Sequence, residues 1–124
     1  IKSSALMEVC QEGRVKAAKL LLSAGANMKE VDPQAIFRAI YQNNLPMVQL
    51  MVENSLNVNC HCNSGYKIDS RVSYADITPL GAACVECTEE RLEIIDLLLA
   101  AGASVNATFE KYTRDADIKT LKIK

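Results

Sequence analysis

The stretch TPLGAACVECTEERLEIIDLLLAAGASVNA, Thr78–Ala107, contains signals for two helices joined by a turn. Thr78 offers a hydroxyl that suits a helix N-cap, and Pro79 suits the first helical position, where its missing N–H costs nothing. The charged run from Glu86 to Arg91 interrupts the apolar pattern and predicts the turn. The second helix is expected to end at Gly102, because glycine readily adopts the left-handed conformation that closes a helix.

Both helices of this unit are predicted to bury an apolar face. The first has small or apolar side chains and is expected to pack closely against its neighbours; these are Leu80, Ala82, Ala83 and Cys84. The second has side chains at helical spacing that predict one apolar stripe; these are Leu92, Ile95, Leu98 and Leu99. Two helices of this size cannot bury such faces alone, so the sequence predicts neighbouring units of the same kind.

Two earlier stretches repeat the order of short helix, turn, apolar helix and closing residue. The first runs from Ser4 to Ala26 and the second from Gln34 to Leu56, with Asn43 and Ser55 in place of glycines. The mid-turn residue and the closing residue have the same separation in each unit: Gly13 to Gly25, Asn43 to Ser55, and Glu90 to Gly102. This periodicity predicts stacked helix pairs that share one elongated core.

The units resemble the ankyrin repeat family over roughly residues 4 to 107. The family motif is most complete in the third unit, in Thr78, Pro79, Leu80, Ala83, Leu98, Leu99, Gly102, Ala103, Val105 and Asn106. The resemblance implies an all-α solenoid of ankyrin-type helix–turn–helix repeats. One domain is expected over residues 1–124, with repeats at about 4–30, 33–60 and 78–107, an insert at 60–77, and a partial repeat or tail at 108–124.

The chain departs from the family pattern in two ways. The family usually has histidine after its TPL triplet, whereas this chain has Met7, Phe37 and Gly81, so the hydrogen bonds of that histidine must be absent or replaced. Against the family period of roughly 33 residues, the first connection is about three residues shorter and the second about eleven longer, and we expect the third short helix to be extended by about three. These irregularities are where function is expected to reside.

The long connection, residues 60–77, is predicted to be an enlarged hairpin, or finger. Asn63-Ser64-Gly65 is a turn signal, and strand-prone residues follow it, namely Tyr66, Ile68 and Val72. Tyrosine and arginine often anchor interfaces, which makes Tyr66, Arg71 and Tyr74 candidate partner-binding residues. The alternative is a tolerated surface loop. In the tail, Leu121 is expected either to take the Leu80 position of a truncated fourth unit or to belong to a short strand or tail.

The five cysteines and the single histidine are the only constellation that suggests chemistry. A set of zinc ligands is conceivable from their types; it comprises Cys60, His61, Cys62, Cys84 and Cys87. Its two halves are expected to lie apart in the inferred fold, and Cys84 aligns with Cys10 and Ile40 in a predicted buried slot. A zinc-stabilised domain is therefore the remote alternative. An odd number of cysteines without a secretion signal favours free thiols in a reducing, cytoplasmic compartment.

Composition and motifs argue against several classes of function. A net charge of −1 gives no field that would attract nucleic acid. No apolar run reaches the roughly 18 residues of a membrane span. Phosphate loops and Ser/His/Asp spacings are absent from the sequence, so we expect no enzyme and no cofactor. Because the chain begins at Ile1, we expect an excised segment of a longer polypeptide.

The resemblance implies a protein-interaction module within that polypeptide. Family contact positions on the concave helix face map onto Gln11, Glu12, Tyr41, Gln42, Val85 and Glu86, joined by Tyr66, Arg71 and Tyr74 of the finger. The acidic group Glu86, Glu89, Glu90 and Glu93 is either a solvated face or a site for a basic peptide. The alternative function is an intramolecular spacer or regulatory lid of an enzyme or channel. Partner identity and oligomeric state are not predicted.

Overall fold

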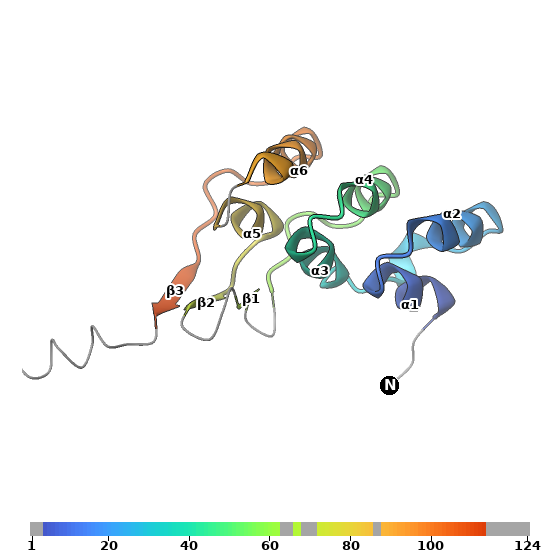
Figure 1. Cartoon of the computed structure of the whole chain (residues 1–124), viewed down its shortest axis with the longest axis horizontal. Helices are drawn as coiled ribbons and strands as arrows, with labels where there is room; N and C mark the ends of the chain where they lie inside the picture. The colour runs from blue at the N-terminus through green and yellow to red at the C-terminus, as the bar shows by residue number, and fades with distance from the viewer. Residues whose placement is uncertain (1–3, 63–65, 68–71, 86–87, 114–124) are drawn as a thin grey trace, which may run out of the picture.

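A computed structural model describes residues 4–62, 66–67, 72–85 and 88–113 of the chain. Within them, six α-helices form three pairs: α1 (Ala5–Gln11) with α2 (Val15–Ser23), α3 (Ala35–Tyr41) with α4 (Leu45–Glu53), and α5 (Pro79–Val85) with α6 (Glu89–Ala100). A short 3-10 helix, η1 (Met28–Glu30), lies in the first connection. The helices α1, α3 and α5 occupy one row and α2, α4 and α6 the other (Figure 1). The predicted stack of helix pairs is confirmed.

The predicted helix signals lie where the helices begin and end. The hydroxyls of Ser4 and Thr78 each accept a hydrogen bond from the backbone N–H three residues later, at 3.1 and 3.2 Å. Asn43 and Ser55 have φ angles of 55° and 67°, in the left-handed region. They take the backbone conformation that glycine supplies elsewhere, at Gly13, Gly25 and Gly102. The interpretation of Asn43 and Ser55 as glycine replacements is confirmed.

The third helix pair divides differently from the prediction. α5 has 7 residues, as α1 and α3 do, whereas α6 has 12 residues and α2 and α4 have 9. The side chain of Thr88 accepts a hydrogen bond from the N–H of Arg91 and caps α6, so Glu89 and Glu90 are helical. Acidic residues in a first turn are favoured by the helix dipole. The predicted turn through Glu90 and Arg91 is wrong, and the extension belongs to the second helix of the pair.

α6 also turns a different face to the core. It buries Arg91, Ile94 and Leu98, whereas Leu92 and Leu99 of the predicted stripe are 54% and 43% exposed. The apolar residues of α6 occupy more than one face, and the neighbouring helices α4 and α5 cover only one of them. Beyond α6 the described residues contain no further helix pair that could cover another face. Only Leu98 of the predicted stripe is fully buried.

Cys84 in α5 is exposed for the same reason. It corresponds in position to Cys10 of α1 and Ile40 of α3, which are both buried. Those two residues have a following helix pair beside them, and α5 has none among the described residues. The predicted buried slot therefore holds for the first two repeats and is wrong for Cys84.

The middle helix pair is the most completely buried part of the molecule, although its sequence matches the repeat pattern least well. α3 buries Ala35, Ile36, Phe37, Ala39 and Ile40, and α4 buries Met47, Val48, Leu50 and Met51. Helix pairs flank it on both sides (Figure 1). The two methionines of α4 are fully enclosed, so their flexible side chains fill gaps in the core and do not form a binding surface.

A buried arginine joins the third helix pair to the second. Arg91, 2% exposed, donates from Nε to Oδ1 of Asn43 at 2.6 Å. Its two terminal nitrogens donate to the backbone carbonyls of Ala82, at 3.2 Å, and Tyr41, at 3.4 Å. All three acceptors are neutral oxygens, and two of them belong to the preceding repeat. Arg91 is thus a structural residue of the interface between repeats, which its charge alone did not indicate.

Asparagines make further polar contacts between consecutive repeats. Nδ2 of Asn44 donates to the carbonyl of Gly13 at 3.1 Å. Asn59 donates to the carbonyl of Gly102 at 3.2 Å and accepts a hydrogen bond from the N–H of Ser104 at 2.9 Å. These side chains, with Arg91, supply polar contacts between repeats in a chain that lacks the family histidine.

The predicted finger is a hairpin that belongs to a three-stranded antiparallel sheet. The strand order is β1 (Tyr66–Lys67), β2 (Val72–Ala75) and β3 (Glu110–Thr113). Tyr74 lies opposite Tyr66 on one side and Lys111 on the other. The N–H of Cys62 donates to the carbonyl of Ile77 at 2.9 Å and closes the base of the finger. The predicted turn at residues 63–65, Ile68 and Leu121 lie outside the described residues.

We expect Arg91→Ala to lower the free energy of unfolding by about 2 kcal/mol or more, because one buried and two partly buried acceptors lose their donor. Arg91→Lys should restore little of this, since one ammonium group cannot reproduce the fork of the guanidinium. Urea denaturation measures both effects. Arg38→Ala, at an exposed position of α3, is the matched control and should change stability by no more than about 0.5 kcal/mol. Equal losses in Arg91→Ala and Arg38→Ala would contradict the structural role of Arg91.

Candidate functional site

The helices α1, α3 and α5, together with the sheet, form the surface that we call the short-helix face (Figure 1). Five predicted site residues lie at the C-terminal ends of these helices: Gln11 and Glu12, Tyr41 and Gln42, and Val85. Gln11, Glu12 and Gln42 come together with Arg38 around a small polar hollow of about 210 Å³. Tyr41 is 51% exposed. Glu86 and Arg71 lie outside the described residues.

The two tyrosines predicted to anchor a partner are buried. Tyr66 is 5% exposed and Tyr74 is 7% exposed. The ring of Tyr66 packs against Phe37, with centroids 6.2 Å apart, and against Tyr41 in an edge-on arrangement at 6.0 Å. Side chains of opposite strands on one face of a sheet share the same environment, and this face lies on the helices. Tyr66 therefore attaches the finger to α3, and Tyr74 is buried opposite it on β2.

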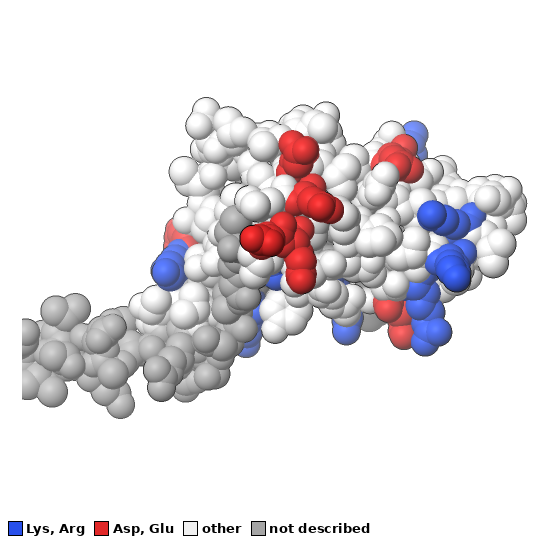
Figure 2. All heavy atoms as spheres, turned by 45° about the horizontal axis from the view of Figure 1, so that its top comes forward, with Lys and Arg blue, Asp and Glu red and all other residues white. Residues whose placement is uncertain are grey.

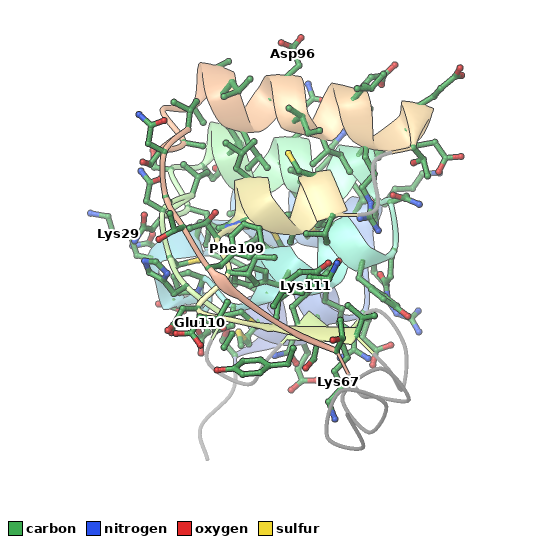
Figure 3. The ribbon with its side chains drawn as sticks, turned by 90° about the vertical axis from the view of Figure 1, so that its left-hand side faces the viewer. Lys29, Lys67, Asp96, Phe109, Glu110 and Lys111 are labelled. Carbon is green, nitrogen blue, oxygen red and sulfur yellow. The ribbon has the colours of Figure 1, made fainter. Side chains whose placement is uncertain are left out.

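Phe109 makes the equivalent contact one repeat later. Its ring lies edge-on to Tyr74, with centroids 5.6 Å apart. It also covers Gly81 of α5, where an added Cβ would lie 2.7 Å from the Phe109 ring and 2.9 Å from Ile77. Figure 3 shows Phe109 at the start of β3, beside α5. At Gly81, where the family usually has histidine, the Phe109 ring occupies the space next to the backbone.

A hollow of the short-helix face lies between α1, α3 and β1, and we call it the Phe37 pocket. Its volume is about 360 Å³. Apolar side chains form part of the lining, namely Met7, Ala35, Phe37 and Tyr66. Other lining residues are polar or carry an exposed ring, namely Gln11, Arg38, Tyr41 and Lys67. An apolar cavity with a few polar groups is the usual form of a binding site.

Sequence reasoning found only part of this pocket. Gln11, Tyr41 and Tyr66 were candidates, whereas Arg38 and Lys67 were not. Met7 and Phe37 stood out as departures from the family histidine, and that departure was the available signal. The pocket itself could not be foreseen, because it unites residues from the first repeat, the second repeat and the finger.

Two residues of the suggested zinc set, Cys60 and His61, contact different backbone carbonyls. His61 Nδ1 lies 2.8 Å from the carbonyl oxygen of Asp76, and the Cys60 thiol contacts the carbonyl of Pro33 at 3.7 Å. Burial raises the pKa of the Cys60 thiol to about 11, which favours the neutral thiol over the thiolate that binds zinc. Within the described segments, no three His, Cys, Asp or Glu residues form a group suited to a metal ion. Cys87 lies outside these segments.

Charged side chains gather at the two ends of the helical stack. Figure 2 shows acidic side chains over α6 and basic side chains over α2. The acidic group includes Glu89, Glu90, Glu93 and Asp96, all exposed. Glu89, Glu90 and Glu93 were predicted to surround a turn and instead lie along the helix. No helix in the described part of the chain is long and apolar enough to cross a membrane.

Comparisons of sequence identify relatives of this chain. A family model for ankyrin repeats, in three copies, matches residues 6–109. Ankyrin repeat and SOCS box protein 6 from mouse is 32% identical over 109 residues, 85% of this chain and 23% of that protein. The human protein of the same name is 32% identical over 123 residues, 96% of this chain and 26% of that protein. The chain therefore spans about a quarter of the length of these relatives.

Solved structures show the same fold. An ankyrin repeat domain from Acinetobacter baumannii matches with a TM-score of 0.59 and 27% identity, covering 82% of this chain and 49% of that one. The human ASB11 ankyrin repeat domain matches with a TM-score of 0.56 and 24% identity, covering 86% of this chain and 43% of that one. The resemblance and the repeat fold predicted from the sequence are confirmed.

The contact between Gly81 and Phe109 can be tested by introducing Gly81→Ala into the wild-type chain and into a Phe109→Ala variant. In an open helix position, glycine to alanine usually stabilises by about 0.5–1 kcal/mol. Here we expect Gly81→Ala to destabilise by about 1–3 kcal/mol, because the new methyl group collides with the Phe109 ring. In the Phe109→Ala variant, Gly81→Ala should lower the free energy of unfolding by clearly less. Thermal or urea unfolding of the four proteins measures the coupling, and an identical effect of Gly81→Ala in both backgrounds would contradict the contact.

Proposed function

This chain belongs to the ankyrin repeat family, and we propose that it is a protein-interaction module of a longer polypeptide that binds its partner through the short-helix face. The observation that carries this proposal is the Phe37 pocket of about 360 Å³, whose rim includes the half-exposed ring of Tyr41. Exposed aromatic groups beside a preformed hollow are characteristic of surfaces where binding energy is concentrated. Gln11, Glu12 and Gln42 extend this surface along the ends of the short helices.

The packed helices behind this face allow a small contact area to bind a partner with useful affinity. The helices that carry the exposed side chains have buried core residues, for example Leu6 and Cys10 in α1 and Ile36 and Ile40 in α3. Side chains held on a packed helix lose little backbone freedom on binding, so less of the contact energy is spent on ordering. This supports recognition of a partner by the surface as it stands.

We further propose that the module acts without catalysis, in the cytoplasm. Three cysteines in the described part of the chain are free thiols, Cys10, Cys60 and Cys62. Free thiols are typical of reducing compartments. The residues that line the Phe37 pocket include no nucleophile held by a neighbouring histidine, which supports a binding role.

A second candidate function is intramolecular. The relatives named ankyrin repeat and SOCS box protein 6 are about four times as long as the matching stretch, so other parts of such a polypeptide are available to contact this domain. In that case the short-helix face would pack against another segment of its own chain, as a spacer or regulatory lid. The same surface residues would be used, but the occupant would be covalently linked.

Quantitative affinity capture from cell extract tests the proposed function. We expect the double variant Tyr41→Ala/Gln42→Ala to capture about tenfold less partner than the wild type, because the substitutions remove exposed groups of the short-helix face. The matched control is Lys19→Ala/Gln49→Ala, at exposed positions of α2 and α4. Unfolding curves establish that both variants fold. Recovery of the same proteins in the same amounts with both variants would contradict binding through this face. Capture only of other segments of the parent polypeptide would favour the intramolecular candidate.

A further inference from the structure

The third residues of the three short helices occupy equivalent positions in the repeats. These residues are Met7 in α1, Phe37 in α3 and Gly81 in α5. Phe37 is covered by Tyr66 from β1, and Gly81 is covered by Phe109, next to β3. In both cases the covering ring comes from the extended segment that follows the repeat. The chain therefore uses the same packing arrangement twice, with an aromatic residue supplied by its own connection.

The first repeat has no such ring. Its connection is short and contains η1 in place of a strand, and no aromatic residue occurs between Ala26 and Gln34. The N–H of Asp32, in this connection, donates to the Met7 sulfur at 3.3 Å. The Phe37 pocket lies at this position, with Met7 in its lining. The pocket is thus the place where the aromatic side chain of the repeated arrangement is missing.

The rim of the pocket carries positive charge toward solvent. Arg38 and Lys67 both line the pocket and are exposed, and neither forms an ion pair within the residues that the structure describes. Asp32 also lines the pocket, where its carboxylate accepts a hydrogen bond from the N–H of Gln34 at 3.0 Å and keeps its negative charge, so the two cations outnumber the one anion. Two cations beside an apolar hollow favour a ligand that combines an apolar group with a carboxylate.

We propose that the Phe37 pocket binds an aromatic side chain carried by an extended segment of the partner protein, with an acidic residue next to it. This inference rests on the proposed function and specifies the chemistry of the partner. The chain itself contains such a pair in Phe109 and Glu110, whose aromatic member fills the equivalent position in the third repeat. A cavity of about 360 Å³ lies within the usual range for binding pockets, about 300–1,000 Å³. Burial of the ring would supply most of the affinity, and the carboxylate would set the preference for sequence.

The test is an NMR titration of the isotope-labelled chain with a blocked pentapeptide, Ala-Thr-Phe-Glu-Lys, taken from residues 107–111. We expect the amide signals of Met7, Phe37 and Arg38 to shift with a common binding curve. Replacing phenylalanine by alanine in the peptide should weaken binding about tenfold, since the buried ring is lost. Replacing the glutamate by lysine should weaken it about threefold or more, because the rim is cationic.

Two matched pairs of variants assign the contacts. Arg38→Glu should reverse the preference between the glutamate and lysine peptides, whereas Lys19→Glu, on α2, should leave it unchanged. Tyr41→Ala should weaken binding of the phenylalanine peptide, whereas Tyr112→Ala should not, although the two tyrosines are similarly exposed, at 51% and 54%. All four residues are exposed, so these substitutions are expected to preserve the fold.

Three results would overturn the inference: equal affinity for the phenylalanine and alanine peptides, an unchanged charge preference in Arg38→Glu, or shifts confined to the surroundings of Gly81. Any of them, together with a loss of captured partner in Tyr41→Ala/Gln42→Ala, would leave the proposed function intact and reject only the aromatic–acidic ligand. Specific peptide binding combined with unchanged capture would support the pocket chemistry and reject the partner-binding role of the short-helix face.

Discussion

The burial of the middle helix pair on both sides is the constraint on which the rest of the structure depends. The residues of α3 and α4 that have no exposed surface include Ile36, Ile40, Met47, Val48 and Met51. Neither flanking pair is enclosed in this way, since Leu20 in α2 and Leu92 in α6 are 72% and 54% exposed. The middle pair therefore sets the position of both neighbours, and α3 supplies the central side chains of the short-helix face. The apolar contacts that stabilise the stack also build the Phe37 pocket.

Polar side chains fix how the repeats meet. Apolar packing is largely non-directional, so hydrogen bonds such as those of Arg91 and Asn59 define the relative position of neighbouring pairs. Aromatic rings do the same for the sheet, because Tyr66 and Phe109 attach the strands to α3 and α5. Positions where the family has histidine thus hold apolar contacts here, and the polar contacts between repeats lie elsewhere. The departures from the family pattern are compensated in the fold and give the short-helix face its individual chemistry.

The features that could be predicted from the sequence are those decided locally. N-caps at Ser4 and Thr78, left-handed residues at Asn43 and Ser55, and the hairpin at the long insert depend on neighbouring residues in the chain. The features that were missed depend on neighbours in space. The leucine-rich sequence of α6 fits more than one buried face, and its contacts with α4 and α5 select Ile94 and Leu98. In the same way, tyrosine is a residue type that often anchors interfaces, but Tyr66 is buried and packs against Tyr41. The residues that line the Phe37 pocket come from separate segments of the sequence.

Native-state hydrogen exchange tests most directly whether the core is centred on the middle helix pair. Amides in α3 and α4 should exchange slowest and only through global unfolding, because any smaller opening leaves one flanking pair in place over them. Amides in α2 and α6 should exchange through smaller openings, with a weaker dependence on denaturant. Slowest exchange in α6 or α2, with earlier opening of α3 and α4, would contradict the account.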